Sequence, residues 1–201
     1  MSESYSKQIR QIVSAAESGT IFINSDFSAI ASSSTVRRQL NRLVAEGTLR
    51  RLMNGLYEKP VYSEFLKEYL AADPDAIAEA LARNFRWTIA PCCDTALNLL
   101  GLSTQVPSSW SYISDGPYRT YELDGIRLTF KHRTQREILD MSASTILVIE
   151  ALKALGKDNV TDTVIEDLRK RFSKNEKAAM LKEATEATDW IYRKIGMISK
   201  A

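Results

Sequence analysis

The chain has 201 residues, of which 44% are hydrophobic and 26% charged, and its formal net charge is +2. These values are ordinary for a folded globular protein, and 8 glycines with 5 prolines leave no room for a long disordered tract. No apolar run approaches the roughly 18 residues needed to span a bilayer, and the opening MSESYSKQIRQIV lacks the apolar core of a signal peptide. We therefore expect a cytoplasmic protein that makes no contact with a membrane.

The cysteine and histidine counts limit the chemistry that the chain can carry. Its two cysteines, Cys92 and Cys93, are adjacent, a spacing that does not favour an ordinary disulfide and offers a metal too few ligands. With one histidine, His132, a metal site built from His and Cys is excluded. We expect two reduced, partly buried cysteines and neither a metal nor another cofactor.

Positive charge is concentrated near the N-terminus. Residues 1–60 hold eight basic and five acidic side chains, whereas residues 61–201 hold 19 basic and 20 acidic ones. Six of the eight N-terminal basic residues lie between positions 37 and 59. A local excess of this kind is typical of a surface that binds nucleic acid.

The first sixty residues predict a series of short elements. Residues 6–17 carry apolar side chains at i, i+3, i+4 and i+7, which indicates an amphipathic helix that ends before Gly19. The run TIFI predicts a strand, and SDFSAIA predicts a short helix capped by Asn24 or Ser25. A third helix begins in the serines at 32–34 and stops at Gly47.

A β-hairpin is expected directly after the third helix. The segments TLRRL and LYEKP flank Asn54-Gly55, the strongest short hairpin signal, because both turn positions take a positive φ cheaply. Helix, strand, helix, helix and hairpin follow one another in the order of a winged helix-turn-helix. We therefore predict an α+β protein with a winged helix over residues 1–60 and a mixed α/β domain with a helical C-terminal end over residues 61–201.

The third helix and the hairpin carry the candidate DNA contacts. The helix buries its apolar residues on one face, so its polar face is turned outward. Major-groove base edges are expected to be read by Arg38, Asn41 and Arg42. Phosphates are expected to be held by Ser34, Arg37, Arg50, Arg51 and Asn54. The alternative is a protein-interaction module whose arginines are solvated surface and which docks a partner without specific DNA binding.

The remainder predicts alternating helices and strands. Helices are expected at residues 62–72 and 74–85, a strand at RWTIA, a short helix at CCDTALNLLGL, and a hairpin at TYEL-DG-IRLTFKH with Asp124-Gly125 at its turn. Three further helices are expected at residues 142–155, 163–172 and 175–195. The basic run at residues 131–136 is either a second surface for nucleic acid or an acidic partner, or a solvated strand end.

The sequence offers no catalytic constellation. His132 has basic neighbours and no nearby nucleophile to activate, and the glycines form no phosphate-binding loop. A Gly-Ser followed by paired aspartates, which a nucleotidyltransferase would show, is also absent. We expect a protein that is not an enzyme.

Two segments resemble a known family. IFINSDFSAIASSSTVRRQLNRLVAEGTLRRLMNGLYEKP resembles the N-terminal winged helix of AbiEi-family antitoxins, through Ser25-Asp26-Phe27, residues 35–43 and Gly55-Leu56-Tyr57. PCCDTALNLLGLSTQVPSSWSYISDGPYRTYELDGIRLTFKHR is similar to the same family at residues 96–107, at residues 110–114 and at Asp115-Gly116-Pro117.

The resemblance implies an antitoxin of a bacterial toxin-antitoxin or phage-defence pair. Its winged helix would bind double-stranded promoter DNA of its own operon and repress it. Its partner would be a nucleotidyltransferase-like toxin, which it counteracts without necessarily forming a stable complex. Such a repressor would read inverted repeats either as separate monomers or as a homodimer.

Overall fold

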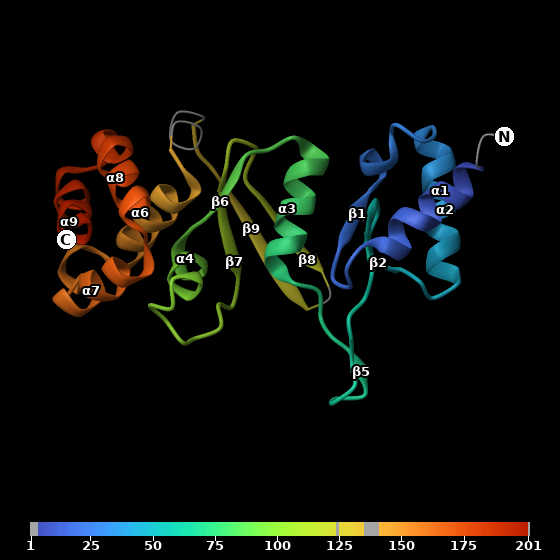
Figure 1. Ribbon diagram of the computed structural model, residues 1–201, viewed down its shortest axis with the longest axis horizontal. Helices are drawn as coiled ribbons and strands as arrows, with labels where there is room; N and C mark the ends of the chain where they lie inside the picture. The colour runs from blue at the N-terminus through green and yellow to red at the C-terminus, as the bar shows by residue number, and fades with distance from the viewer. Residues whose placement is uncertain (1–3, 124, 135–140, 201) are drawn as a thin grey trace. The chain divides into compact units, whose positions relative to one another are not determined.

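The computed structural model describes residues 4–123, 125–134 and 141–200 (Figure 1). It has the expected α+β class, with an N-terminal helix-strand region, a central mixed sheet and a helical C-terminal end. Two compact units are present, one formed by Met1–Trp87 with Glu122–Ile126 and the other by Thr88–Tyr121 with Arg127–Ala201. In the described part of the chain, no helix is both long and apolar enough to cross a bilayer.

The first unit opens with the elements of a winged helix. They are α1 (Tyr5–Ala15), β1 (Ile21–Ile23), the 3₁₀ helix η1 (Asn24–Phe27), α2 (Ser33–Ala45), β2 (Arg50–Met53) and β3 (Leu56–Glu58). The strands form an antiparallel sheet in the order β1-β3-β2. One apolar cluster joins the helices to this sheet: Ile9, Val13, Phe22, Phe27, Val36, Leu40, Leu43, Leu49 and Tyr57.

Local signals set the ends of these elements. Gly47, with φ of 76°, follows the last turn of α2, and Gly55, with φ of 86°, closes the turn between β2 and β3. The predicted caps of the short helix are wrong, because the Asp26 carboxylate accepts the Ile23 backbone N–H at 2.8 Å. Asp26 thus closes the turn from its third position, and neither Asn24 nor Ser25 acts as the cap.

The first unit continues past the predicted boundary at residue 60. A small hairpin of β4 (Tyr62–Ser63) and β5 (Glu68–Tyr69) follows the wing, and α3 (Pro74–Phe85) follows the hairpin. The Arg83 guanidinium donates to the Ile21 carbonyl at 3.0 Å, which ties α3 to β1. Because α3 packs on the winged-helix sheet, the division between the units falls after Trp87.

The central sheet has four strands in the order β6-β7-β9-β8. Its strands are β6 (Ile89–Pro91), β7 (Trp110–Ser114), β8 (Arg119–Leu123) and β9 (Ile126–His132), and α4 (Cys93–Leu99) lies between β6 and β7 in the chain. β7 pairs antiparallel with β6 and parallel with β9. The predicted turn residue Asp124 lies outside the described residues, whereas Gly125 has the positive φ expected of that turn.

The C-terminal end is helical. It contains α6 (Ala143–Leu155), the 3₁₀ helix η2 (Lys157–Asn159), α7 (Asp162–Arg171), α8 (Lys174–Glu183), the 3₁₀ helix η3 (Ala184–Glu186) and α9 (Asp189–Ser199). An apolar cluster of the described residues unites these helices with α4. The single helix predicted over residues 175–195 is wrong, because Ala187 and Thr188 adopt extended backbone conformations that separate η3 from α9.

Candidate nucleic-acid interface

Helix α2 turns a polar, positively charged face to solvent. Val36, Leu40 and Leu43 are buried in the core of the winged helix. At 100° per residue, the opposite side of the helix is outward. Four exposed polar residues occupy that side, Ser34, Arg38, Asn41 and Arg42, and exposed Arg37 lies on its flank. All three predicted base-reading residues therefore share one exposed face with Ser34, a predicted phosphate-binding residue.

A buried tyrosine orients Asn41. The Tyr57 hydroxyl donates to Asn41 Oδ1 at 3.1 Å, and Tyr57 itself is 1% exposed. An amide oxygen has two acceptor sites and the amide nitrogen has two hydrogens, so Asn41 keeps one acceptor site and both donors. A bidentate contact to an adenine edge requires one acceptor and one donor. Asn41 is therefore held in place and still equipped to read a base.

Arg42 is engaged in an exposed ionic cluster. Its Nε donates to Glu46 Oε1 at 3.0 Å, and Arg10 of α1 lies 2.7 Å from Glu46 Oε2. The hydrogen bond from Arg10 is the largest of the influences that hold the pKa of Glu46 below its usual value. Since ion pairs between exposed side chains contribute little to stability, Arg42 can leave Glu46 for a base at small cost.

The wing presents Arg51 and Asn54 at its tip. Arg51 lies on β2 and Asn54 in the turn, both are exposed, and the Arg51 guanidinium donates to Asn54 Oδ1. The register of β2 against β3 shifts between Arg51 and Met53. An exposed guanidinium on a hairpin tip suits a contact with the sugar-phosphate backbone.

Arg50, the neighbour of Arg51, is part of the fold. Its Nε and an NH2 nitrogen donate to Glu58 Oε2 at 2.9 and 2.6 Å, and the same NH2 nitrogen donates to the Leu70 carbonyl at 3.0 Å. The side chain of Glu58 is 2% exposed. A buried carboxylate without a positively charged partner would destabilise the fold. Arg50 therefore stabilises the hairpin. The phosphate contact predicted for Arg50 would require it to leave this pairing.

Three of the predicted phosphate-binding residues meet at one hollow. Arg37, Arg51 and Asn54 line a space of about 410 Å³ in the first unit. The rest of the lining comes from Asn24, Gly55, Tyr57 and Asn84. Two guanidinium groups in a polar hollow favour an anionic ligand such as a phosphate group. Ser34 lies outside this lining, at the start of α2, with its Oγ 3.2 Å from Ser32 Oγ.

Sequence reasoning missed three residues of this site. Asn24 and Asn84 reach the hollow from η1 and α3, and no pattern in the sequence links these elements to the wing. Tyr57 belongs to the Gly55-Leu56-Tyr57 motif, but sequence reasoning assigned it no part in the site, although in the structure it lies on the sheet face that covers α2. Its hydroxyl contact with Asn41 depends on the packing of α2 against β3.

Comparison with known proteins gives one family. A family model described as Family of unknown function (DUF6088) matches residues 8–180. The chain belongs to the DUF6088 family. The matched residues include most of the winged helix and most of the second unit. No curated protein matches the chain significantly.

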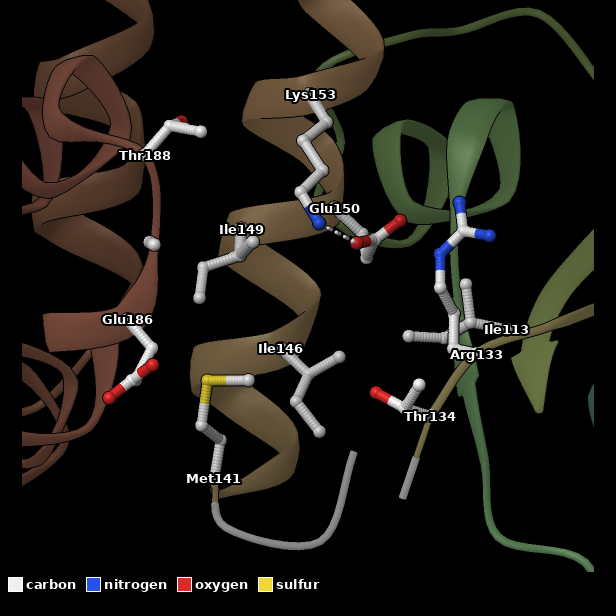
Figure 2. Close-up of a pocket in the computed structure, with 11 residues that line it drawn as sticks. Ile113, Arg133, Thr134, Met141, Ile146, Ile149, Glu150, Lys153, Glu186 and Thr188 are labelled. Carbon is white, nitrogen blue, oxygen red and sulfur yellow. Dashed lines mark hydrogen bonds and ion pairs between the residues drawn. The ribbon is translucent and has the colours of Figure 1, made fainter. Parts of the chain in front are cut away.

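The second unit of this DUF6088 protein has a hollow of its own, of about 280 Å³ (Figure 2). Ile146, Ile149 and Glu150 line it from α6, and Arg133 and Thr134 line it from the chain that follows β9. Glu150 is 6% exposed and accepts a hydrogen bond from Lys153 at 2.7 Å. The charged groups at this hollow are of both signs, so it is not a basic surface.

The basic run that begins at Lys131 does not form one surface. Lys131 donates to Cys93 Sγ at 3.0 Å, the His132 ring nitrogen Nδ1 lies 2.9 Å from the Gly116 carbonyl, and Arg133 donates to the His132 carbonyl. Successive side chains point to opposite faces of a strand, which divides the run. Arg136, its last basic member, lies outside the described residues.

The two cysteines of this DUF6088 protein are free thiols beside the sheet. Cys92 is buried and Cys93 is half-buried, as expected. Burial is the main cause that raises the pKa of the Cys92 thiol, so this group stays protonated and unreactive. The hydrogen bond to Cys93 raises the pKa of Lys131. Among the residues that the structure describes, no group of three or more His, Cys, Asp or Glu side chains could hold a metal ion.

Proposed function

We propose that this chain binds double-stranded DNA through α2 and the wing of its first unit. The observation that carries the proposal is the meeting of Arg37, Arg51 and Asn54 at one polar hollow. This hollow adjoins the helix face that exposes Arg38, Asn41 and Arg42. A recognition helix with a flanking phosphate contact is the arrangement with which helix-turn-helix proteins bind the major groove.

The geometry supports a division of labour among these residues. Arg38, Asn41 and Arg42 project from the outward side of α2 and would read base edges. Arg37 and Arg51, together with Asn54, would hold a phosphate group in the hollow, and Ser34 would meet the backbone at the start of α2. We leave Arg50 out of the contact set because it is bound to Glu58.

We further propose that the protein is a cytoplasmic antitoxin that represses its own operon. The resemblance to AbiEi-family antitoxins supports this role, and in that role the second unit would serve to counteract a nucleotidyltransferase-like toxin. Repression would follow from occupation of the promoter by the winged helix. Neutralisation of the toxin would require no stable complex with it.

A gel-shift titration on the DNA upstream of the gene tests the proposal. We expect binding to this DNA about 10³-fold tighter than to a shuffled duplex of the same length, because specific readout adds to the phosphate term common to both. Both duplexes should be titrated at one fixed salt concentration. Equal affinity for the two duplexes would contradict DNA recognition and would favour a protein-interaction module.

A further inference from the structure

The β4–β5 hairpin exposes an unusual amount of apolar surface. Its tip carries Phe65, which is 93% exposed, and Leu66, which is 53% exposed. Tyr62 and Tyr69 face each other across the strands, 45% and 59% exposed, with their rings 5.2 Å apart. In Figure 1 the hairpin projects away from the helices and the sheet of the first unit. Within that unit its apolar side chains therefore have little to pack against.

The hairpin is nevertheless held in a defined conformation. Its turn is closed by hydrogen bonds from the Lys67 and Leu66 backbone N–H groups to Ser63, at 2.8 and 3.1 Å. Its base is closed by the Leu70 N–H bond to the Val61 carbonyl at 2.8 Å. A contact surface that is already ordered loses less conformational entropy when it binds.

The base of the hairpin is also joined to the wing. The Arg50 guanidinium bridges the Leu70 carbonyl and the buried Glu58 carboxylate. Because Arg50 lies on β2 and Glu58 on β3, whatever docks on the hairpin is coupled to the strands of the wing.

The chemistry of the hairpin fits a protein partner and opposes a nucleic acid. Its charged residues are Glu64, Lys67 and Glu68, and Lys67 pairs with Glu64 at 3.1 Å. The resulting net negative charge would repel phosphates. Five exposed apolar residues, Tyr62, Phe65, Leu66, Tyr69 and Leu70, offer roughly 500 Å² of surface, since a large aromatic side chain alone carries about 150–250 Å².

We propose that this hairpin docks on the same hairpin of a second copy of the chain, around a two-fold axis. Two such surfaces together would bury about 1,000 Å², near the lower bound of specific interfaces. The surface is self-complementary, because aromatic rings meet aromatic rings and Lys67 of one copy can meet Glu68 of the other. The described residues of each chain hold one winged helix, and two-fold pairing presents two of them to the half-sites of a palindrome. This last consequence rests on the proposed function, whereas the dimer does not.

Sedimentation analysis of the full chain at about 1 to 100 μM, without DNA, tests the proposal. We expect a concentration-dependent dimer, and we expect Phe65→Ser to raise its dissociation constant at least about tenfold, because an apolar anchor is lost from both copies. The matched control is Val106→Ser in the second unit, which removes an 80% exposed apolar side chain and should leave the dimer unchanged. Thermal unfolding of each variant checks that the fold is kept.

Three results would overturn the proposal. They are a wild-type chain that remains monomeric at about 100 μM, a dimer that Phe65→Ser leaves intact, and equal weakening by Phe65→Ser and Val106→Ser. A monomeric wild type whose DNA affinity falls with Phe65→Ser would instead assign the hairpin to DNA. A dimer that binds the upstream DNA no better than shuffled DNA would support the pairing and contradict the proposed function alone.

Discussion

Asn41 and Arg42 differ in what their hydrogen bonds leave available to a base. The Tyr57 hydroxyl fixes the Asn41 amide from within the core, and this bond does not compete with an adenine contact. Arg42 is held by exposed Glu46, whose carboxylate it shares with Arg10. We therefore infer that Asn41 is preorganised for readout, whereas Arg42 has to exchange one partner for another.

Replacing Tyr57 with Phe tests the orientation of Asn41. Tyr57→Phe keeps the buried ring and removes the hydroxyl, so discrimination at one base position should fall by about 1 kcal/mol, or roughly fivefold. Anisotropy titrations with single-base variants of the operator measure the change. Tyr192→Phe, on exposed α9 surface, is the control. If the Tyr57→Phe variant discriminates between bases as well as the wild type at every position, the hydroxyl does not position Asn41.

At the scale of elements, the two adjacent arginines of β2 lie in different environments. Arg50 is half-buried and bound to Glu58, whereas Arg51 is exposed beside the turn. Successive residues of a strand face opposite sides, which explains why neighbours of identical chemistry separate in this way. One arginine therefore stabilises the hairpin, and the other is the exposed one to which we assign a DNA contact.

Replacing Arg50 with alanine should lower the stability of the fold, whereas replacing Arg51 should weaken the salt dependence of DNA binding. Arg50→Ala leaves the Glu58 carboxylate without this ion pair and should lower the free energy of unfolding by about 3 kcal/mol. Arg51→Ala should change it by less than about 0.5 kcal/mol and should reduce the slope of log affinity against log salt by about one. Denaturant unfolding and DNA titrations at several salt concentrations measure both. The account is wrong if Arg51→Ala leaves the salt slope unchanged.

Most elements could be predicted from local patterns, and the exceptions have physical causes. The turn glycines of the winged helix and Pro74 in the first turn of α3 lie where the apolar periodicity places the ends of elements. The helix predicted over residues 62–72 is wrong, because these residues form a hairpin followed by chain without regular secondary structure. An amphipathic helix depends on burying its apolar face, and Phe65 and Tyr69 remain exposed in the structure. Periodicity alone does not reveal whether a face will find a partner.

The sequence predicts those features of the candidate site that depend on one helix or one strand alone. The outward face of α2 and the exposure of Arg51 follow from helix and strand periods. The pairing of Arg50 with Glu58 depends on cross-strand register, which places them opposite each other. The contribution of Asn84 to the hollow depends on the packing of α3, far along the chain. Contacts between different elements therefore could not be predicted from the sequence alone.

Across the whole molecule, charge is divided unequally. Residues 1–60 carry eight basic and five acidic side chains, and residues 61–201 carry 19 and 20. The exposed arginines of α2 and the wing belong to the first group. Electrostatic attraction to DNA should therefore depend on particular residues of the first unit and not on the total charge of the chain.

The most direct test of this claim removes one positive charge from each unit in turn. Anisotropy titrations of the upstream DNA and of a shuffled duplex should compare the wild type with Arg38→Ala, on α2, and Lys170→Ala, on exposed surface of α7. We expect Arg38→Ala to reduce the preference for the upstream DNA by about 1–3 kcal/mol, because a base contact is lost, and Lys170→Ala to leave it unchanged. Equal effects of the two variants, or no preference in the wild type, would contradict the account.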